Sequence, residues 1–278
     1  MCRPRRALGK AKREVLHAVG SRLGLVVPVR AEGGWWIRIP DDHVLYHLTR
    51  GSYEPQEIRF FRSMLKPGDT ALDIGANFGL YTILAAKQVG REGRVLAFEP
   101  NPNSLRYLRL NILLNRQSRI EVVPVALSNE EGETEFICVS QGAYSALKVG
   151  ETPGTTSAIR VRQTTLDAIA AAESLYLVDF VKMDVEGAEL LVLQGGEEFF
   201  SRIPRPLVMC EFNDNRAAPY GHTSRDVYQW LRDRDYEWFR LSDNARLLAQ
   251  SDETRYDYTN LVACPVEKLD SIARWTDG

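Results

Sequence analysis

Short apolar runs alternate with stretches of helical periodicity along most of the chain. Four such runs are each followed by a segment in which apolar residues recur at helical spacing. Apolar strands that alternate with helices form a parallel sheet with helices on both faces, because each crossover lays a helix over the sheet. The predicted strand and helix pairs are 71–74 with 80–89, 94–99 with 102–115, 179–184 with 188–194, and 206–212 with 224–232.

Further elements are expected around this repeat. A helix at 55–65 should end at Lys66-Pro67-Gly68, which cannot continue it. An apolar run at 121–127 leads into strands with the alternation of a β-hairpin insertion, and two late strands should close the sheet. The hairpin strands are 134–139 and 158–163, and the closing pair is 236–241 and 260–265.

The first fifty residues have a different pattern and are expected to form a small N-terminal appendage. Residues 7–23 predict an amphipathic helix, and residues 25–50 predict short strands that include WWIRIP and HVLYHL. We therefore divide the chain into an N-terminal helix with short strands at 1–50 and one main domain at 51–278.

Composition and charge exclude several classes of protein. Hydrophobic residues make up 44% and charged residues 26%, as in soluble globular proteins. The net charge of −2 gives no broad footprint for nucleic acid, and we expect no such partner. No window approaches the roughly 18 apolar residues of a membrane span, and the N-terminus lacks the apolar stretch of a secretion signal. We expect a cytoplasmic protein and leave a homo-oligomer open.

The strongest chemical signal is the run Asp73-Ile74-Gly75-Ala76-Asn77-Phe78-Gly79 after the first core strand. Its glycines follow a G-x-x-x-G spacing, whereas a dinucleotide fold needs G-x-G-x-x-G around a pyrophosphate. Asp73 would repel a pyrophosphate but attract an ammonium group. Glu99 ends the second strand, where a carboxylate can accept both hydroxyls of a ribose. A ligand with an ammonium, a ribose and no phosphate is S-adenosylmethionine.

These residues, with others, resemble the FkbM family of S-adenosylmethionine-dependent methyltransferases. The most specific match is VKMDVEGAE, from Val181 to Glu189, and the resemblance covers about residues 50–265. It implies a Rossmann-like class I methyltransferase fold, with a mostly parallel seven-stranded sheet and helices on both faces. It also implies methyl transfer to a hydroxyl of a sugar, a polyketide or another secondary metabolite. Other matching runs are Tyr53-Glu54-Pro55, Phe98-Glu99-Pro100, Ala126-Leu127-Ser128 and Thr165-Leu166-Asp167.

The resemblance assigns cofactor residues by position. The methionine part would be held by the glycine loop and the ribose by Glu99. Ala126 and Leu127 would edge the adenine, and Glu54 would lie near the methionine end. Asp184 would serve both cofactor and substrate. The loop residues concerned are Asp73, Gly75, Ala76, Asn77 and Gly79.

A hydroxyl acceptor needs its proton removed, so a general base or a metal is expected. Asp184 and Glu211 end the fourth and fifth strands and should point to the same edge of the sheet. With Asn213 they form an alternative Mg²⁺ site, which we favour less than positioning of cofactor and substrate. His222 lies in the loop after the fifth strand and is the preferred base. Asp184, Glu211 and His222 are therefore the catalytic candidates.

Two alternatives remain open at this point. One is methylation of an amine or a nucleic-acid base, although enzymes acting on base amino groups usually have N/D-P-P-Y/F where this chain has MDVE. The other is a scaffold protein that kept the fold and lost the chemistry. An inactive relative would be expected to lose the pocket acids Asp73, Glu99 and Asp184, and all three are present.

Overall fold

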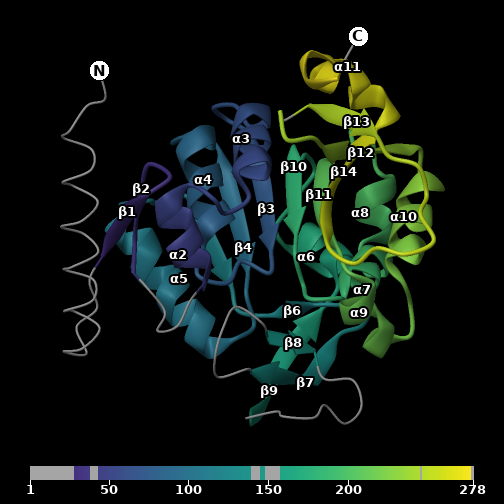
Figure 1. Cartoon of the computed structure of the whole chain (residues 1–278). Coiled ribbons are helices and arrows are strands. Elements are labelled where there is room, and N and C mark those ends of the chain that lie inside the picture. Colours follow the sequence, from purple (N-terminus) through teal and green to yellow (C-terminus); the bar gives the residue numbers. More distant parts are fainter. Residues whose placement is uncertain (1–27, 38–42, 139–144, 148–156, 245, 277–278) are drawn as a thin grey trace, which may run out of the picture.

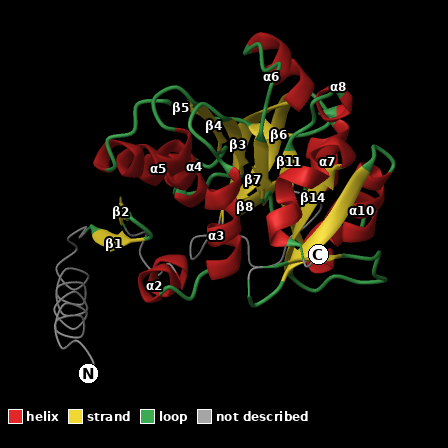
Figure 2. Cartoon of the chain, turned by 90° about the horizontal axis from the view of Figure 1, so that it is seen from above, coloured by secondary structure: helices red, strands yellow, loops and turns green. Residues whose placement is uncertain are grey.

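The computed structural model describes residues 28–37, 43–138, 145–147, 157–244 and 246–276. A large twisted sheet lies between two layers of helices (Figures 1 and 2). Its eight strands, in spatial order, run β13-β12-β14-β11-β10-β3-β4-β5. Their bounds along the chain are β3 Thr70–Ile74, β4 Arg94–Phe98, β5 Ile120–Val123, β10 Phe180–Met183, β11 Leu207–Phe212, β12 Tyr236–Leu241, β13 Leu247–Ala249 and β14 Thr259–Pro265.

The five neighbouring strands from β11 to β5 pair in parallel. At the other edge, β14, β12 and β13 each pair antiparallel with the strand beside them. β3 pairs with β4 on one side and with β10 on the other, so Asp73 lies opposite Lys182. β14 runs antiparallel to β11, and β12 runs antiparallel to β14. This is the Rossmann-like class I methyltransferase fold that the sequence predicts, with its closing strand pair.

The strand number differs from the prediction. Seven strands correspond to those expected, and β13 adds an eighth at the edge by pairing with Arg240 and its neighbours in β12. β13 has only three residues, Leu247–Ala249, which is too short to show an alternation of apolar and polar positions.

The predicted hairpin insertion forms a second, four-stranded sheet of order β6-β9-β7-β8. β7 and β9 pair antiparallel along their whole length, as expected. The run 121–127 divides between the two sheets, β5 joining the large one and β6 the small one. Pro124 lies at the division and has no N–H to donate to a strand partner. The small-sheet strands are β6 Ala126–Leu127, β7 Gly132–Cys138, β8 Ser145–Leu147 and β9 Ser157–Thr164.

The N-terminal segment is built from a short hairpin and a helix. Strands β1 (Val29–Ala31) and β2 (Gly34–Trp36) pair antiparallel. The run HVLYHL, expected as a strand, forms helix α2 (His43–Arg50) instead. Val44 and Leu48 are four residues apart and face the domain, whereas Tyr46 between them is exposed. This spacing of inward-facing residues is that of a helix. The predicted helix at 7–23 lies outside the described residues.

This segment packs into the main domain and shares its core. Trp36 is fully buried, and its ring meets Phe78 edge to face with centroids 5.8 Å apart. The side chain of Asn115 accepts a hydrogen bond from the Trp35 N–H at 2.9 Å, and that of Asn111 accepts one from the Ile37 N–H at 2.7 Å. The hairpin is therefore fixed directly behind the glycine loop.

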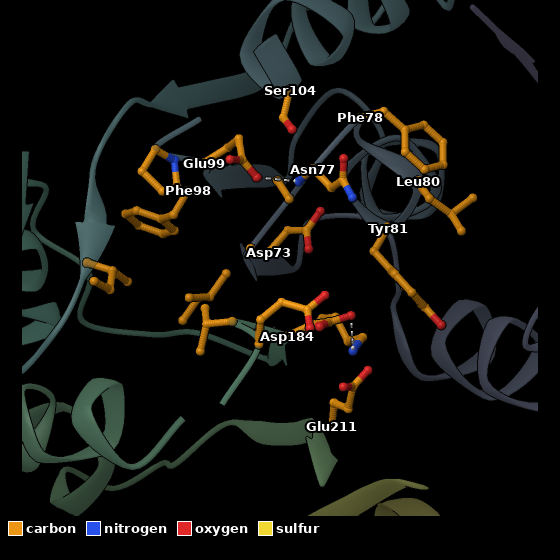
Figure 3. A pocket seen from close by; sticks show the side chains of 18 of the residues that line it. Asp73, Asn77, Phe78, Leu80, Tyr81, Phe98, Glu99, Ser104, Asp184 and Glu211 are labelled. Carbon is orange, nitrogen blue, oxygen red and sulfur yellow. Dashed lines mark hydrogen bonds and ion pairs between the residues drawn. The ribbon is translucent and has the colours of Figure 1, made fainter. Parts of the chain in front are cut away.

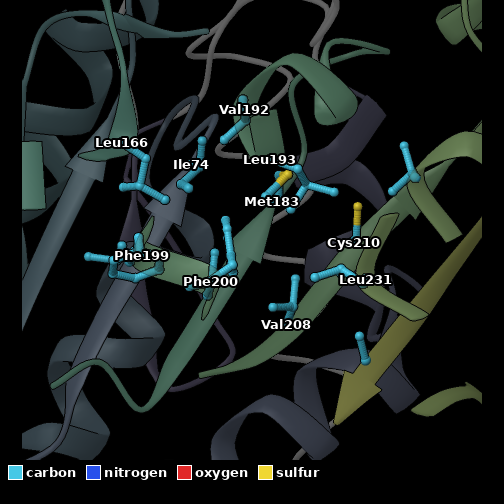
Figure 4. Packing of buried hydrophobic residues seen from close by; sticks show 14 of the residues in the cluster. Ile74, Leu166, Met183, Val192, Leu193, Phe199, Phe200, Val208, Cys210 and Leu231 are labelled. Atoms are coloured by element: carbon cyan, nitrogen blue, oxygen red, sulfur yellow. The ribbon is translucent and has the colours of Figure 1, made fainter. Parts of the chain in front are cut away.

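Two hydrophobic layers hold the helices against the sheet. Helices α4 and α5 lie on one side of the sheet, and α7, α8 and α10 lie on the other (Figure 2). On the latter side, Met183 and Val208 of the sheet pack against Val192, Phe200 and Leu231 (Figure 4). Within the described residues, every helix is too short or too polar to cross a lipid bilayer. The helix bounds not yet given are α3 Pro55–Met64, α4 Leu80–Val89, α5 Pro102–Leu114, α6 Leu166–Ala172, α7 Glu189–Gln194, α8 Glu197–Ser201, α9 Asp214–Ala217, α10 Ser224–Arg232 and α11 Leu269–Ile272, with 3-10 turns at Ala218–Tyr220, Val266–Lys268 and Ala273–Trp275.

Candidate active site

A cavity of about 250 Å³ opens at the carboxyl ends of β3, β4, β10 and β11 (Figure 3). Open parallel sheets bind their ligands at this edge, because the loops that leave neighbouring strands meet there. The glycine loop, the end of β4 and the end of β10 supply most of its wall. Predicted site residues that line it are Asp73, Gly75, Ala76, Asn77, Glu99, Ala126, Leu127, Asp184 and Glu211.

The glycine loop is held between two neighbouring loops. The N–H groups of Gly75 and Ala76 both donate to the Phe98 carbonyl, at 3.0 and 2.9 Å. Gly75 has a φ of 86°, and a Cβ there would run into the backbone carbonyl of Asp184. The close approach of the loop after β10 therefore requires a glycine here, and its predicted contact with a ligand stays a prediction.

Gly79 does not line the cavity, unlike the other predicted residues of the glycine loop. Its φ is 93°, and a Cβ there would lie 2.5 Å from Cδ1 of Leu108 in α5. It begins α4 in the left-handed region and brings that helix against α5. Gly79 could affect ligand binding only indirectly, by fixing the conformation of the loop.

Asp73 is buried at the end of β3, with 4% of its surface exposed. Its carboxylate accepts a hydrogen bond from the Thr82 hydroxyl in α4. Burial raises the pKa of Asp73 to about 6, although the Thr82 hydrogen bond and the charge of Lys182 act in the opposite direction. A cation bound beside Asp73 would relieve this cost of burial.

Glu99 is held by backbone amides at the end of β4. One carboxylate oxygen accepts from the Asn77 N–H and the other from the Asn101 N–H, each at 2.8 Å. Burial raises the pKa of Glu99 to about 7 despite these two donors. Each oxygen keeps a further lone pair, so Glu99 can accept two hydroxyl donors from a ligand. Beside it, buried Ala126 and Leu127 form an apolar wall that suits a flat ring.

Lys182 is a buried cation in β10 that lines the cavity and has no role predicted from the sequence. Its Nζ lies 3.5 Å from Asp184 Oδ2 and 3.4 Å from Asn260 Oδ1, and only 1% of the side chain is exposed. Burial lowers the pKa of Lys182, but the charges of Asp184, Glu54 and Glu211 together outweigh burial and raise it. A lone lysine within the apolar strand DFVKMD was the available sequence signal, because an unpaired charge is rarely buried.

The Glu54 carboxylate accepts hydrogen bonds from three side chains that are distant in the sequence. Tyr81 donates to it at 2.6 Å, Tyr258 at 3.2 Å and Asn260 at 3.0 Å. Tyr81 and Tyr258 line the cavity, whereas Glu54 stands behind them. Glu54 therefore helps to shape the cavity indirectly, through Tyr81 and Tyr258, and its predicted place near the methionine part of the cofactor stays a prediction.

Two further carboxyl groups face the same end of the cavity. Glu211 and Glu186 both line it, and Glu186 forms an ion pair with Arg216 Nε at 3.5 Å. Burial and the charge of Asp184 raise the pKa of Glu211 and of Glu186. Glu189, in the first turn of α7, accepts the backbone N–H groups of Val185 and Gly187 and holds this loop in place.

The structure brings neither Asn213 nor His222 to the cavity wall. Asn213 begins α9, where its side chain accepts the Asn215 N–H at 3.1 Å. His222 is buried beside the backbone of Gly187, and burial lowers its pKa. Among the described residues, no group of three His, Cys, Asp or Glu side chains is arranged to hold a metal. The role of His222 stays a prediction.

Proteins that are similar to this chain in sequence include one synthetase and two methyltransferases. AMB antimetabolite synthetase AmbE of Pseudomonas aeruginosa is 28% identical over 63% of this chain, which spans 10% of that protein. The 31-O-demethyl-FK506 methyltransferase FkbM of Streptomyces tacrolimicus is 24% identical over 58% of this chain and 75% of its own length. Hexuronic acid methyltransferase AglP of Haloferax volcanii is 27% identical over 51% of this chain and 56% of its own.

The family match covers the glycine loop and the strand ends that line most of the cavity. The methyltransferase FkbM domain matches residues 73–238, from the glycine loop to β12 and more than half of the chain. This range contains Asp73, Glu99, Asp184 and Glu211. The chain therefore belongs to the FkbM methyltransferase family.

Proposed function

We propose that the chain is an S-adenosylmethionine-dependent O-methyltransferase whose acceptor is a hydroxyl of a sugar or a secondary metabolite. The observation that carries this proposal is the pair of buried carboxylates, Asp73 and Glu99, at adjacent strand ends of one cavity. Asp73 suits the ammonium of the cofactor and Glu99 its ribose hydroxyls. The apolar wall at Ala126 and Leu127 suits the adenine.

The opposite end of the cavity suits an acceptor with hydroxyl groups. When bound, S-adenosylmethionine supplies an electrophilic methyl group and leaves as a thioether. Asp184 and Glu211 can orient an acceptor hydroxyl, and Tyr53 and Tyr258 offer ring faces to it. Two relatives, the 31-O-demethyl-FK506 methyltransferase and the hexuronic acid methyltransferase, support an acceptor of this class.

Cofactor binding and methyl transfer test this function together. Asp73→Asn and Glu99→Gln should each weaken S-adenosylmethionine binding by about 10- to 150-fold, because each removes a charge-assisted contact of about 1.5–3 kcal/mol. Isothermal titration measures the affinity. Glu92→Gln, which changes an exposed carboxylate, should leave it unaltered.

Transfer of labelled methyl is then measured to a neutral hexoside, a hexuronic acid, a hydroxylated macrolide and a primary amine. We expect label in an ether product. Label only in the amine would favour N-methylation, and binding without transfer to any of the four would favour a scaffold. Failure of the native protein to bind S-adenosylmethionine would contradict the proposal.

Cofactor binding should release protons near pH 6. In the free protein, Asp73 and Glu99 hold protons up to about pH 6 and 7, because burial raises their pKa values. An ammonium and ribose hydroxyls favour the charged carboxylates, so binding lowers both pKa values and affinity rises with pH across this range. Titration calorimetry in buffers of different ionisation enthalpy should show release at pH 6 and almost none from these groups at pH 8. Equal proton release at both values would contradict this assignment.

A further inference from the structure

Helix α2 brings a histidine to the wall of the cavity. Val44 and His47 of this helix line it, although both lie outside the family match at 73–238. The His47 side chain is exposed as well as cavity-lining, so it lies at the open side, where an acceptor must enter. Leu48 is buried next to it and fixes the helix on the domain.

Ser52 contacts both the ring and the backbone of His47. Nδ1 lies 3.0 Å from Ser52 Oγ, and Oγ lies 3.3 Å from the His47 backbone carbonyl, which also accepts the Ser52 N–H at 3.0 Å. A serine hydroxyl oxygen can accept a hydrogen bond as well as donate one. When Nδ1 carries the proton and donates to Oγ, Nε2 of the neutral ring has a free lone pair.

The other titratable groups at this end are less suited to accept a proton. Burial and the charge of Asp184 raise the pKa values of Glu186 and Glu211, which disfavours the charged form that accepts a proton. Asp184 is paired with the Lys182 ammonium. His222, the base that the sequence favours, is buried outside the cavity wall.

We propose that His47, held by Ser52, is the general base that accepts the proton of the acceptor hydroxyl at Nε2. This inference rests on the proposed O-methyltransferase function. The acceptor O–H bond breaks and its proton moves to Nε2, while an oxygen electron pair forms the new bond to the methyl carbon. The sulfonium keeps the electrons of its broken S–C bond, and the imidazolium later returns its proton to solvent. Ser52 is a positioning residue.

Turnover of matched variants tests the catalytic part. With the acceptor that the native protein methylates fastest in the four-compound panel, His47→Gln should lower the turnover rate by about 100-fold or more. Its affinity for S-adenosylmethionine should stay within about twofold, since the cofactor residues are untouched. Thr49→Ala, an exposed position on the same helix, should leave both unchanged. The rival variant His222→Gln is measured beside them, with thermal unfolding of every variant.

The tautomer provides a second measurement that needs no acceptor. Nitrogen-15 shifts of the His47 ring should show a proton on Nδ1 in the native protein and in Ser52→Thr. Ser52→Ala should show a mixed tautomer and a lower turnover rate with KM unchanged. An Nε2–H tautomer in the native protein, near-normal turnover of His47→Gln, or loss only in His222→Gln would each overturn the inference. If the native protein methylates no hydroxyl acceptor, the proposed function fails and the inference falls with it.

Discussion

Replacing Lys182 with methionine is expected to lower the free energy of unfolding by about 3 kcal/mol at pH 8. Methionine fills a similar volume, but it removes the cation that faces Asp184 at 3.5 Å in a buried site. Breaking a buried ion pair from one side leaves the other charge uncompensated, which is more costly than an exposed pair. Chemical denaturation measures the change. Lys66→Met, at an exposed position, should change the same quantity by less than about 0.5 kcal/mol.

The pH dependence of this loss of stability distinguishes an electrostatic cause from poor packing of the methionine. Asp73, which interacts with the Lys182 charge, has its pKa raised by burial to about 6, and its protonation removes one of the charges that the variant leaves uncompensated. The difference between native protein and Lys182→Met should therefore shrink from pH 8 to pH 5. A loss of equal size at both values would show that methionine packs badly and that the electrostatic reason is wrong.

Gly75→Ala is expected to have the second large effect, on stability and on cofactor binding together. A left-handed residue with a Cβ costs about 1–2 kcal/mol, and the contact with the Asp184 carbonyl adds about 1–3 kcal/mol of overpacking. Because the loop must move, affinity for S-adenosylmethionine should fall by more than about tenfold. Denaturation and titration calorimetry measure the two effects.

Gly221→Ala is the matched control for this substitution. Gly221 has a φ of 79°, and a Cβ there would meet no atom within 4 Å. It isolates the backbone cost without the contact, and cofactor affinity should be unchanged. Equal stability losses in the two alanine variants would mean that the loop after β10 gives way freely.

Hydrophobic periodicity predicts the core of the fold because β3, β4, β10 and β11 are apolar runs that are each followed by a helix. It fails where an element is short. HVLYHL contains residues typical of strands, but Leu48 finds its buried place through a helical turn. β13 has three residues and depends on β12 beside it. Tertiary contacts decide such elements, and no local pattern contains them.

That Asp73, Glu99 and Asp184 line one cavity could be predicted because they lie at strand ends, which topology alone brings together. Their roles toward a ligand stay predictions. Other parts of the site depend on contacts between distant segments, such as Asn260 with Glu54, 206 positions apart in the chain. The loop holding His222 lies at the expected edge, yet its side chain turns to the backbone of Gly187. Side-chain direction in a loop is set by packing that a single sequence does not contain.

The residues that line the cavity come both from the family-matched range and from the segments that flank it. Most lining residues come from within residues 73–238, while Val44, His47 and Tyr53 come from before that range and Tyr258 from after it. Under the proposed function, substitutions at these four flanking positions would alter the shape of the cavity while Asp73 and Glu99 stay in place. A lineage could in this way exchange one acceptor for another and keep the same methyl donor.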